Sequence, residues 1–138
     1  AWREFLALNE DSPAPCEPTR AFFTIVLDQV VVNPNRDYFS YAVSKGAWLG
    51  ILRQLAVNGA PSLRTNAVLP GLVLPGGAMS PERFTQQHAN TPLLLGPSAA
   101  DVASACEFFA TNHTLSGQQL LVDAGRHFAP APRDPAFA

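Results

Sequence analysis

The pattern of apolar and polar positions predicts a short α/β chain. Residues 22–27, FFTIVL, form a continuous apolar run rich in aromatic and β-branched side chains. Such a run is typical of a strand that is buried on both faces of a parallel sheet. Two further strands are expected over residues 64–69 and 119–122.

Between these strands, apolar positions recur every three or four residues and predict helices. The longest helix begins near Asp37 and ends at the Asn-Gly pair of residues 58–59, a common helix terminus. A short helix follows Ser80, which is a suitable cap, with Pro81 at its first position, and runs to about residue 89.

The last predicted helix starts at Ser98, with Asp101 three residues later as in a capping box. The order strand, helix, strand, helices, strand predicts right-handed crossovers between parallel strands. The fold class is therefore α/β, half of a doubly wound parallel sheet. Residues 11–20 are expected to form a loop because they contain three prolines, and the Pro-rich residues 129–138 are expected to form a loose tail.

Composition narrows the class of protein. With 138 residues, 47% hydrophobic and 14% charged, the chain can bury one globular core. The net charge of −2, without a basic cluster, argues against nucleic acid as a partner. No apolar run reaches the length of a membrane span. Cys16 and Cys106 show no metal-binding spacing, so we expect free thiols in a cytoplasmic protein.

Tyr41 and Lys45 stand four residues apart in the longest predicted helix, so their side chains share one face. A free phenol has a pKa of about 10, and an ammonium nearby is expected to lower it. Such a pair suits proton transfer near neutral pH. The same spacing also occurs in ordinary exposed pairs, so the surrounding segments decide between the two interpretations.

Those segments resemble the short-chain dehydrogenase/reductase family. Residues 41–45, YAVSK, match the family's Tyr-x-x-x-Lys. Residues 64–73, RTNAVLPGLV, are similar to its R-x-N-x-V-x-P-G segment, and residues 116–125, SGQQLLVDAG, to its closing TGQ…VDGG stretch. The resemblance covers roughly residues 21–128. It implies that residues 1–128 are a partial domain of this family, followed by the tail of residues 129–138, and that this domain corresponds to the C-terminal half of a Rossmann-type doubly wound sheet, with the first βαβ units absent.

Within that family, the closer likeness is to pteridine-reductase and dihydromonapterin-reductase-like members. Asp28 stands thirteen residues before Tyr41, where most members have a serine, and residues 33–35, Asn-Pro-Asn, follow it as in those members. Asp28 is also consistent with a polar residue that merely closes a strand. Strand carboxyl ends are, however, where open α/β sheets hold their ligands.

The resemblance implies hydride transfer from NADPH, in preference to NADH, to a C=N or C=O bond of a small substrate, with pterin-like rings as first candidates. Tyr41 would supply the proton, and Lys45 would lower the Tyr41 pKa and bind the nicotinamide ribose. Asp28 would orient or protonate the substrate, or share a proton relay with Tyr41, and Asn9 would help to hold a water chain to the lysine. The cofactor-binding backbone would be that of four consecutive residues, Pro70, Gly71, Leu72 and Val73.

Other polar residues carry weaker signals. On composition alone the Pro-Gly pair at residues 70–71 is also an ordinary turn. We expect His88 at the surface, and nothing in the pattern distinguishes Arg126 and His127 from solvated residues.

No glycine-rich phosphate loop occurs in the sequence. Three interpretations explain the absence of this loop. The sequence is an excerpt of a longer protein, a truncated gene product, or a chain that is completed by another chain. The favoured interpretation is an oxidoreductase, at least in its whole form, that works as a homo-oligomer or is completed by another chain. The alternative is a truncated, inactive remnant.

Overall fold

Three parallel strands form the centre of the molecule. The computed structural model describes residues 21–77, 79–129 and 132–137, so Asn9, Cys16 and the expected loop over residues 11–20 lie outside the described residues. The strands are β1 (Ala21–Val26), β2 (Leu63–Pro70) and β3 (Gln119–Val122), in the order β1-β2-β3. All three predicted strands are thereby confirmed to within one residue at each end.

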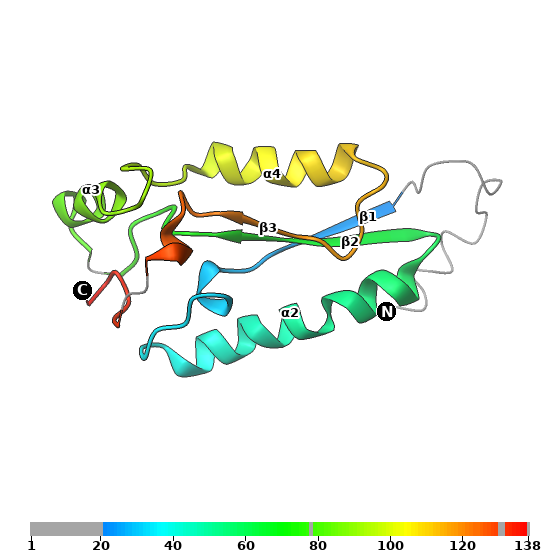
Figure 1. Ribbon diagram of the computed structural model, residues 1–138, viewed down its shortest axis with the longest axis horizontal. Helices are drawn as coiled ribbons and strands as arrows, with labels where there is room; N and C mark the ends of the chain where they lie inside the picture. Colours follow the sequence, from blue (N-terminus) through cyan, green and yellow to red (C-terminus); the bar gives the residue numbers. More distant parts are fainter. Residues whose placement is uncertain (1–20, 78, 130–131, 138) are drawn as a thin grey trace.

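Helices cover both faces of this sheet (Figure 1). Helix α2 (Phe39–Gly59) lies on one face and α4 (Ala99–Thr111) on the other, while the short α3 (Pro81–Ala89) lies beyond the carboxyl ends of the strands. The capping predictions are confirmed. Ser80 accepts a hydrogen bond from the Arg83 backbone N–H, and Ser98 and Asp101 form a capping box.

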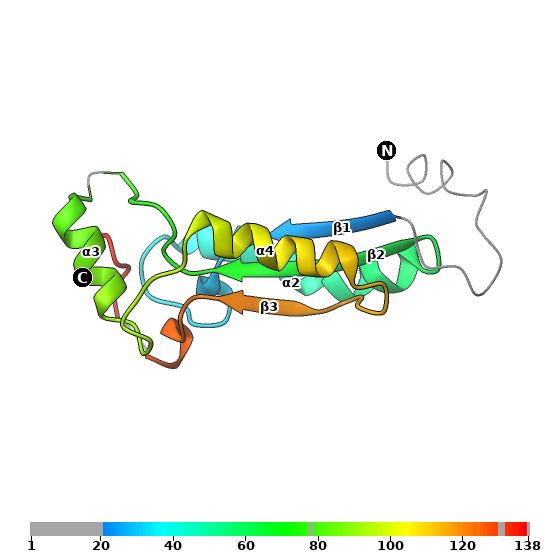
Figure 2. The ribbon, with the colours of Figure 1, turned by 90° about the horizontal axis from the view of Figure 1, so that it is seen from above.

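The two crossovers have opposite hands, so the expectation that both are right-handed is wrong for one of them. The chain moves across the sheet in the same direction from β1 to β2 and from β2 to β3. The connecting helices α2 and α4 nevertheless lie on opposite faces (Figures 1 and 2). Seen from the α4 side in Figure 2, the crossover through α4 is the left-handed one. Most crossovers of this kind are right-handed, and the linear pattern carries no sign of the exception.

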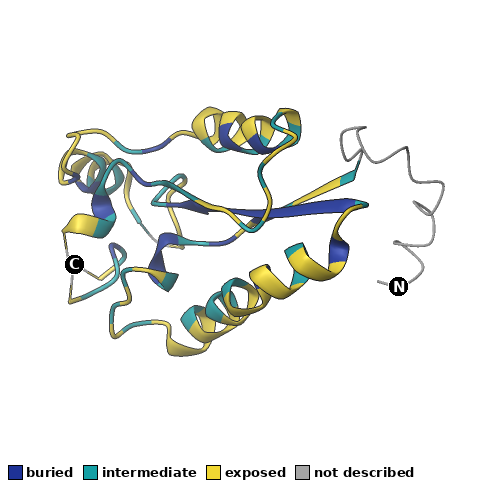
Figure 3. Ribbon diagram, turned by 45° about the vertical axis from the view of Figure 1, so that its right-hand side comes forward, coloured by how far each residue is buried: buried dark blue, intermediate teal, exposed yellow. Residues whose placement is uncertain are grey.

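The core lies on both faces of β2, whose eight residues are all buried. Ala67 and Leu69 pack toward α2 residues such as Leu52, whereas Val68 packs toward Phe109 of α4. This alternation follows from the two-residue period of a strand. Because β2 is the central strand and helices pack on both of its faces, it is buried along its whole length (Figure 3).

Strand β1 is more exposed than predicted. Ile25 is buried, but Phe22, Phe23 and Val26 are 47%, 38% and 47% exposed. The apolar run therefore predicted the strand correctly and its burial wrongly. The physical reason is that β1 is an edge strand here, paired only with β2 among the described strands.

Two polar side chains of β2 form hydrogen bonds with the segment that precedes β3. The Arg64 guanidinium donates hydrogen bonds to the carbonyls of Phe109, Ala110 and Asn112 at the end of α4. Asn66 donates to the Leu115 carbonyl and accepts from the Gln118 backbone N–H. The Arg and Asn of the R-x-N-x-V-x-P-G segment are therefore structural in this fold.

Candidate active site

The candidate site lies at the carboxyl ends of the strands. Asp28 follows β1 by two residues, Gly71 follows β2 directly, and Asp123 follows β3 directly. Because parallel strands end at one edge of a sheet, these residues gather there. This is the edge at which open α/β sheets bind ligands.

Asp28 and Tyr41 are in direct contact. One carboxylate oxygen of Asp28, Oδ1, caps the short helix η1 (Gln29–Val31) by accepting from the Val30 backbone N–H at 2.8 Å. The other oxygen, Oδ2, accepts a hydrogen bond from the Tyr41 hydroxyl at 2.7 Å. The cap therefore orients the carboxylate toward the phenol, which stands in the first turn of α2.

Lys45 lies one helical turn after Tyr41, as its spacing predicts. Its Nζ lies 5.5 Å from the centroid of the Tyr41 ring, in cation–π geometry. The ammonium thus lies over the aromatic ring. The structure therefore brings Asp28, Tyr41 and Lys45 together.

The expectation that the pKa of Tyr41 is lowered is wrong for this arrangement. Burial of the phenol raises its pKa, and the hydrogen bond to Asp28 and the charges of Asp28 and Asp134 raise it further. A nearby carboxylate disfavours the phenolate. Tyr41 is therefore held protonated at neutral pH, with its proton directed toward Asp28.

A cavity of about 520 Å³ opens beside this pair. Asp28 and Tyr41 line it together with Tyr38, Leu72 and Met79. Its size is that of a small-molecule site.

The segment of residues 70–73 leaves β2 beside this cavity. The Gly71 N–H donates to the Val122 carbonyl at 2.9 Å, and a Cβ on Gly71 would lie 3.0 Å from the Cβ of Asp123. Glycine is thus favoured by the close approach of two strand ends. Leu72 lines the cavity, whereas Pro70 is buried and Val73 is half-buried.

His88 is not the solvated residue that the sequence predicts. Its Nε2 lies 2.8 Å from the carbonyl oxygen of Leu72, and its ring packs on Phe84 with centroids 4.1 Å apart. Gly96 lies against the same ring, and a Cβ at that position would overlap it. His88 therefore ties α3 to the backbone of the cavity wall, a contact that a local pattern cannot reveal.

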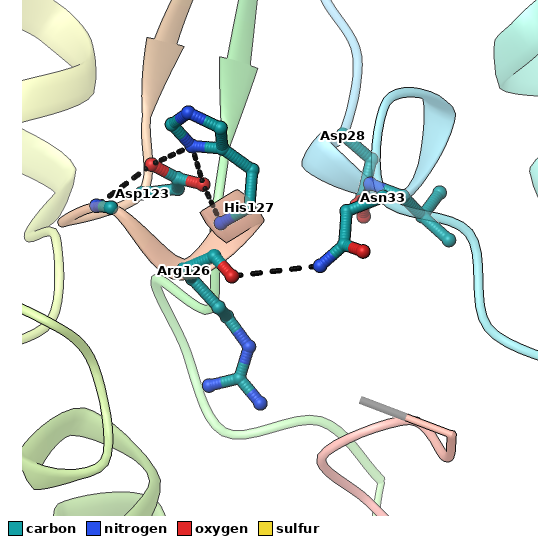
Figure 4. Close-up of polar contacts among 7 residues, drawn as sticks. Asp28, Asn33, Asp123, Arg126 and His127 are labelled. Atoms are coloured by element: carbon teal, nitrogen blue, oxygen red, sulfur yellow. Dashed lines mark hydrogen bonds and ion pairs between the residues drawn. The ribbon is translucent and has the colours of Figure 1, made fainter. Parts of the chain in front are cut away.

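Arg126 and His127 are also more constrained than the sequence predicts (Figure 4). His127 Nδ1 lies 2.8 Å from Asp123 Oδ2, and Asp123 is buried. Arg126 is buried in η2 (Arg126–Phe128) and bonds to the Gln87 side chain at 3.0 Å. The Arg126 carbonyl accepts from Asn33 Nδ2 at 3.5 Å, which links the ends of β3 and β1.

The C-terminal residues 132–137 form part of the same site, contrary to the expectation of a loose tail. Arg133 Nε forms an ion pair with Asp37 Oδ2 at 2.8 Å, and the Asp134 N–H donates to the same oxygen at 2.8 Å. Asp134 and Phe137 line the cavity. The sequence offers no signal for these contacts because their partners stand nearly a hundred residues apart.

The fold and the site together define an α/β protein with a polar ligand site at the carboxyl edge of a parallel sheet. A family model described as Enoyl-(Acyl carrier protein) reductase matches residues 21–127. The chain therefore belongs to this family of the short-chain dehydrogenase/reductase type.

Similar proteins of known sequence include one dehydrogenase and one reductase. The chain is 32% identical over 111 residues to glucose 1-dehydrogenase of Gluconobacter oxydans, covering 74% of this chain and 42% of that protein. It is 31% identical over 101 residues to dihydromonapterin reductase of Citrobacter koseri, covering 72% and 42%. The chain thus spans less than half the length of these relatives.

Similar solved structures confirm the fold as half of a Rossmann-type sheet. FolM alternative dihydrofolate reductase 1 from Brucella suis, in complex with NADP, superposes with a TM-score of 0.76 at 31% identity. The match covers 91% of this chain and 51% of that one. The protein of the same description from Brucella canis, complexed with NADP, gives a TM-score of 0.74 at 31% identity, over 88% and 47% of the two chains. Within the described part of the chain, no helix combines the length and apolar composition of a membrane span.

Proposed function

We propose that the protein is an NADPH-dependent oxidoreductase that reduces a C=N or C=O bond of a small substrate, with a pterin-like ring as first candidate. The observation that carries the proposal is the hydrogen bond from Tyr41 to Asp28 beside the cavity, with Lys45 over the Tyr41 ring. Membership of the short-chain dehydrogenase/reductase type and the likeness to dihydromonapterin reductase support the reaction class.

The Tyr41–Asp28 pair acts as the proton source in this proposal. The phenol carries its proton at neutral pH and is positioned to give it to the reduced substrate atom, and because its pKa is raised this transfer depends on stabilisation of the phenolate. The phenolate that is left beside the Asp28 carboxylate is unfavourable, so it takes up a proton quickly. Solvent supplies that proton, Asp28 passes it to the phenolate as the second member of a relay, and Lys45 stabilises the phenolate electrostatically.

The cavity wall suits a nicotinamide cofactor. A reduced nicotinamide, when bound, would supply the hydride. Leu72, Gly76 and Gly77 line the cavity together with Asp28 and Tyr41. We assign the cofactor-binding role to Tyr41, Lys45 and the backbone of residues 70–73. The NADP complexes of the Brucella proteins favour NADPH over NADH for this chain.

A second candidate is a chain that acts only when another chain, or a second copy, completes it. The exposed apolar side chains of β1, an edge strand, favour this candidate. In this proposal, Asn9 helps to hold a water chain to Lys45. A cytoplasmic location and a homo-oligomer are parts of the same proposal.

Titration of the full-length protein with NADPH and NADH, followed by nicotinamide fluorescence, tests the function. We expect saturable NADPH binding well below millimolar, tighter than roughly −4 kcal/mol, and weaker binding of NADH. The Lys45→Met variant should weaken NADPH binding, whereas Arg53→Met, the same charge change on the exposed part of α2, should not. Absence of saturable binding would reject the proposal.

A further inference from the structure

We propose that Asp134, carried by the folded C-terminal tail, is a second carboxylate of the substrate cavity and selects planar rings that present N–H donors, such as an amino-substituted pteridine. The inference rests on the proposed function, since it names a recognition element of the same site. Nothing in the family motifs of the sequence points to this residue.

The tail is held in place by several independent contacts. Arg133 Nε reaches both Asp37 oxygens, at 3.1 and 2.8 Å, and the Asp134 N–H donates to Asp37 Oδ2. The ion pair lowers the pKa of Asp37, chiefly through the hydrogen bond from Arg133. From the other side, Arg83 Nε donates to the carbonyl of the buried Pro135 at 3.3 Å. The tail is therefore clasped between the start of α2 and α3.

An aromatic surface accompanies this clasp. The rings of Tyr38 and Phe137 pack with centroids 5.4 Å apart, and the Arg133 guanidinium lies 5.4 Å from the Phe137 ring. Tyr38 holds a left-handed backbone conformation, with φ of 51°, which is uncommon for a tyrosine. Both rings line the cavity, so a flat ligand can pack on them.

Asp134 lines this cavity together with Asp28 and Tyr41. Its Oδ1 accepts a hydrogen bond from the Ala136 N–H at 2.9 Å, which orients the carboxylate. Its charge acts on Tyr41, because Asp134 contributes to the raised pKa of that phenol. Two carboxylates on one cavity thus form a strongly accepting lining.

This cavity lining favours ligand groups that donate hydrogen bonds over anionic ligand groups. A carboxylate only accepts hydrogen bonds when ionised, and it pairs best with two adjacent N–H groups of a planar edge. An amino-substituted ring with a neighbouring ring N–H presents such an edge, whereas an oxo group in place of the amine presents an acceptor. Arg83, the cation of the lining, already donates to the Pro135 carbonyl.

The test compares two probes that differ in one group, 2-amino-4-oxopteridine and 2,4-dioxopteridine. Their affinities for the full-length protein are measured by ring fluorescence without any nicotinamide cofactor. We expect the wild type to prefer the amino ring, and Asp134→Asn to reduce that preference roughly tenfold or more, as for loss of a hydrogen bond to a charged group. Glu107→Gln, which neutralises an exposed carboxylate of α4, is the matched control and should leave the preference intact.

Arg133→Gln provides a second arm, because it breaks the clasp while keeping Asp134. It should weaken binding of both rings and reduce the preference, since the carboxylate and the Phe137 ring are both released. An unchanged preference in Asp134→Asn, an equal loss in Glu107→Gln, or binding of neither ring by the wild type would overturn the proposal. Because no cofactor is added, a protein that binds these rings but not NADPH would reject the proposed function and leave this inference standing.

Discussion

At the scale of single residues, the central feature is one proton shared by a phenol and a carboxylate. Tyr41 donates to Asp28 at 2.7 Å, and the pKa of Tyr41 is raised by burial and by the Asp28 carboxylate. The ammonium of Lys45 lies over the ring, 5.5 Å from its centroid. The pair therefore stores the proton under neutral conditions.

Replacement of Asp28 by Asn should lower the pKa of Tyr41 toward about 10. The carboxylate disfavours the phenolate, so its loss lets the phenolate form at a lower pH. The chain has two tyrosines, so a Tyr38→Phe background makes Tyr41 the only one, and the absorbance of tyrosinate then reports it alone. Glu107→Gln in the same background is the control. An unchanged or higher titration midpoint in Asp28→Asn would show that Asp28 does not set this pKa.

The Tyr41–Asp28–Lys45 group was predictable from the resemblance of its segments to the short-chain dehydrogenase/reductase family, and local patterns agree with that assignment. Helical spacing places Tyr41 and Lys45 on one face, and the end of an apolar strand places Asp28 at the ligand edge. The direction of the Tyr41 pKa shift was not predictable, because it depends on which side chain reaches the hydroxyl. The contacts of Asp37 with Arg133 and Asp134 join residues nearly a hundred positions apart, and no local pattern records such pairs.

At the scale of elements, the capping residues and the strand boundaries were predictable, whereas the position of α3 relative to the cavity was not. Helix α3 is tied to the cavity wall by the contact of His88 with the Leu72 carbonyl, and Gly96 leaves the room for that ring. The burial of β1 was mispredicted because an apolar run indicates a strand but not its neighbours.

Two glycine substitutions should therefore change stability in opposite directions. Gly96→Ala would drive a methyl group into the His88 ring and should destabilise the fold by about 1–3 kcal/mol. Gly50→Ala, in the interior of α2 with no atom within 4 Å of the new Cβ, should stabilise it by about 0.5–1 kcal/mol. Urea unfolding of each variant measures both. Equal effects of the two substitutions would contradict the role given to Gly96.

At the scale of the whole molecule, the three parallel strands and the helices on both faces form the second half of a doubly wound sheet. The fold class was predictable because the order of strands and helices repeats that of a parallel sheet. The hand of the α4 crossover was not, since it depends on which face α4 covers. The chain covers 42% of the sequence relatives described above, so its cofactor and its substrate are proposals that binding and turnover experiments test.

The most direct test of the account is a single-turnover reduction with full-length wild type and Tyr41→Phe, following the absorbance of NADPH with a dihydropteridine as substrate. Loss of the proton donor should slow the chemical step by roughly a hundredfold or more, while NADPH affinity changes by less than about threefold. That division between rate and affinity is expected because the hydroxyl gives up its proton only in the reacting complex, whereas the aromatic ring, Lys45 and the backbone of residues 70–73 still bind the cofactor in the variant. A Tyr41→Phe protein that oxidises NADPH at the wild-type rate would contradict the central claim.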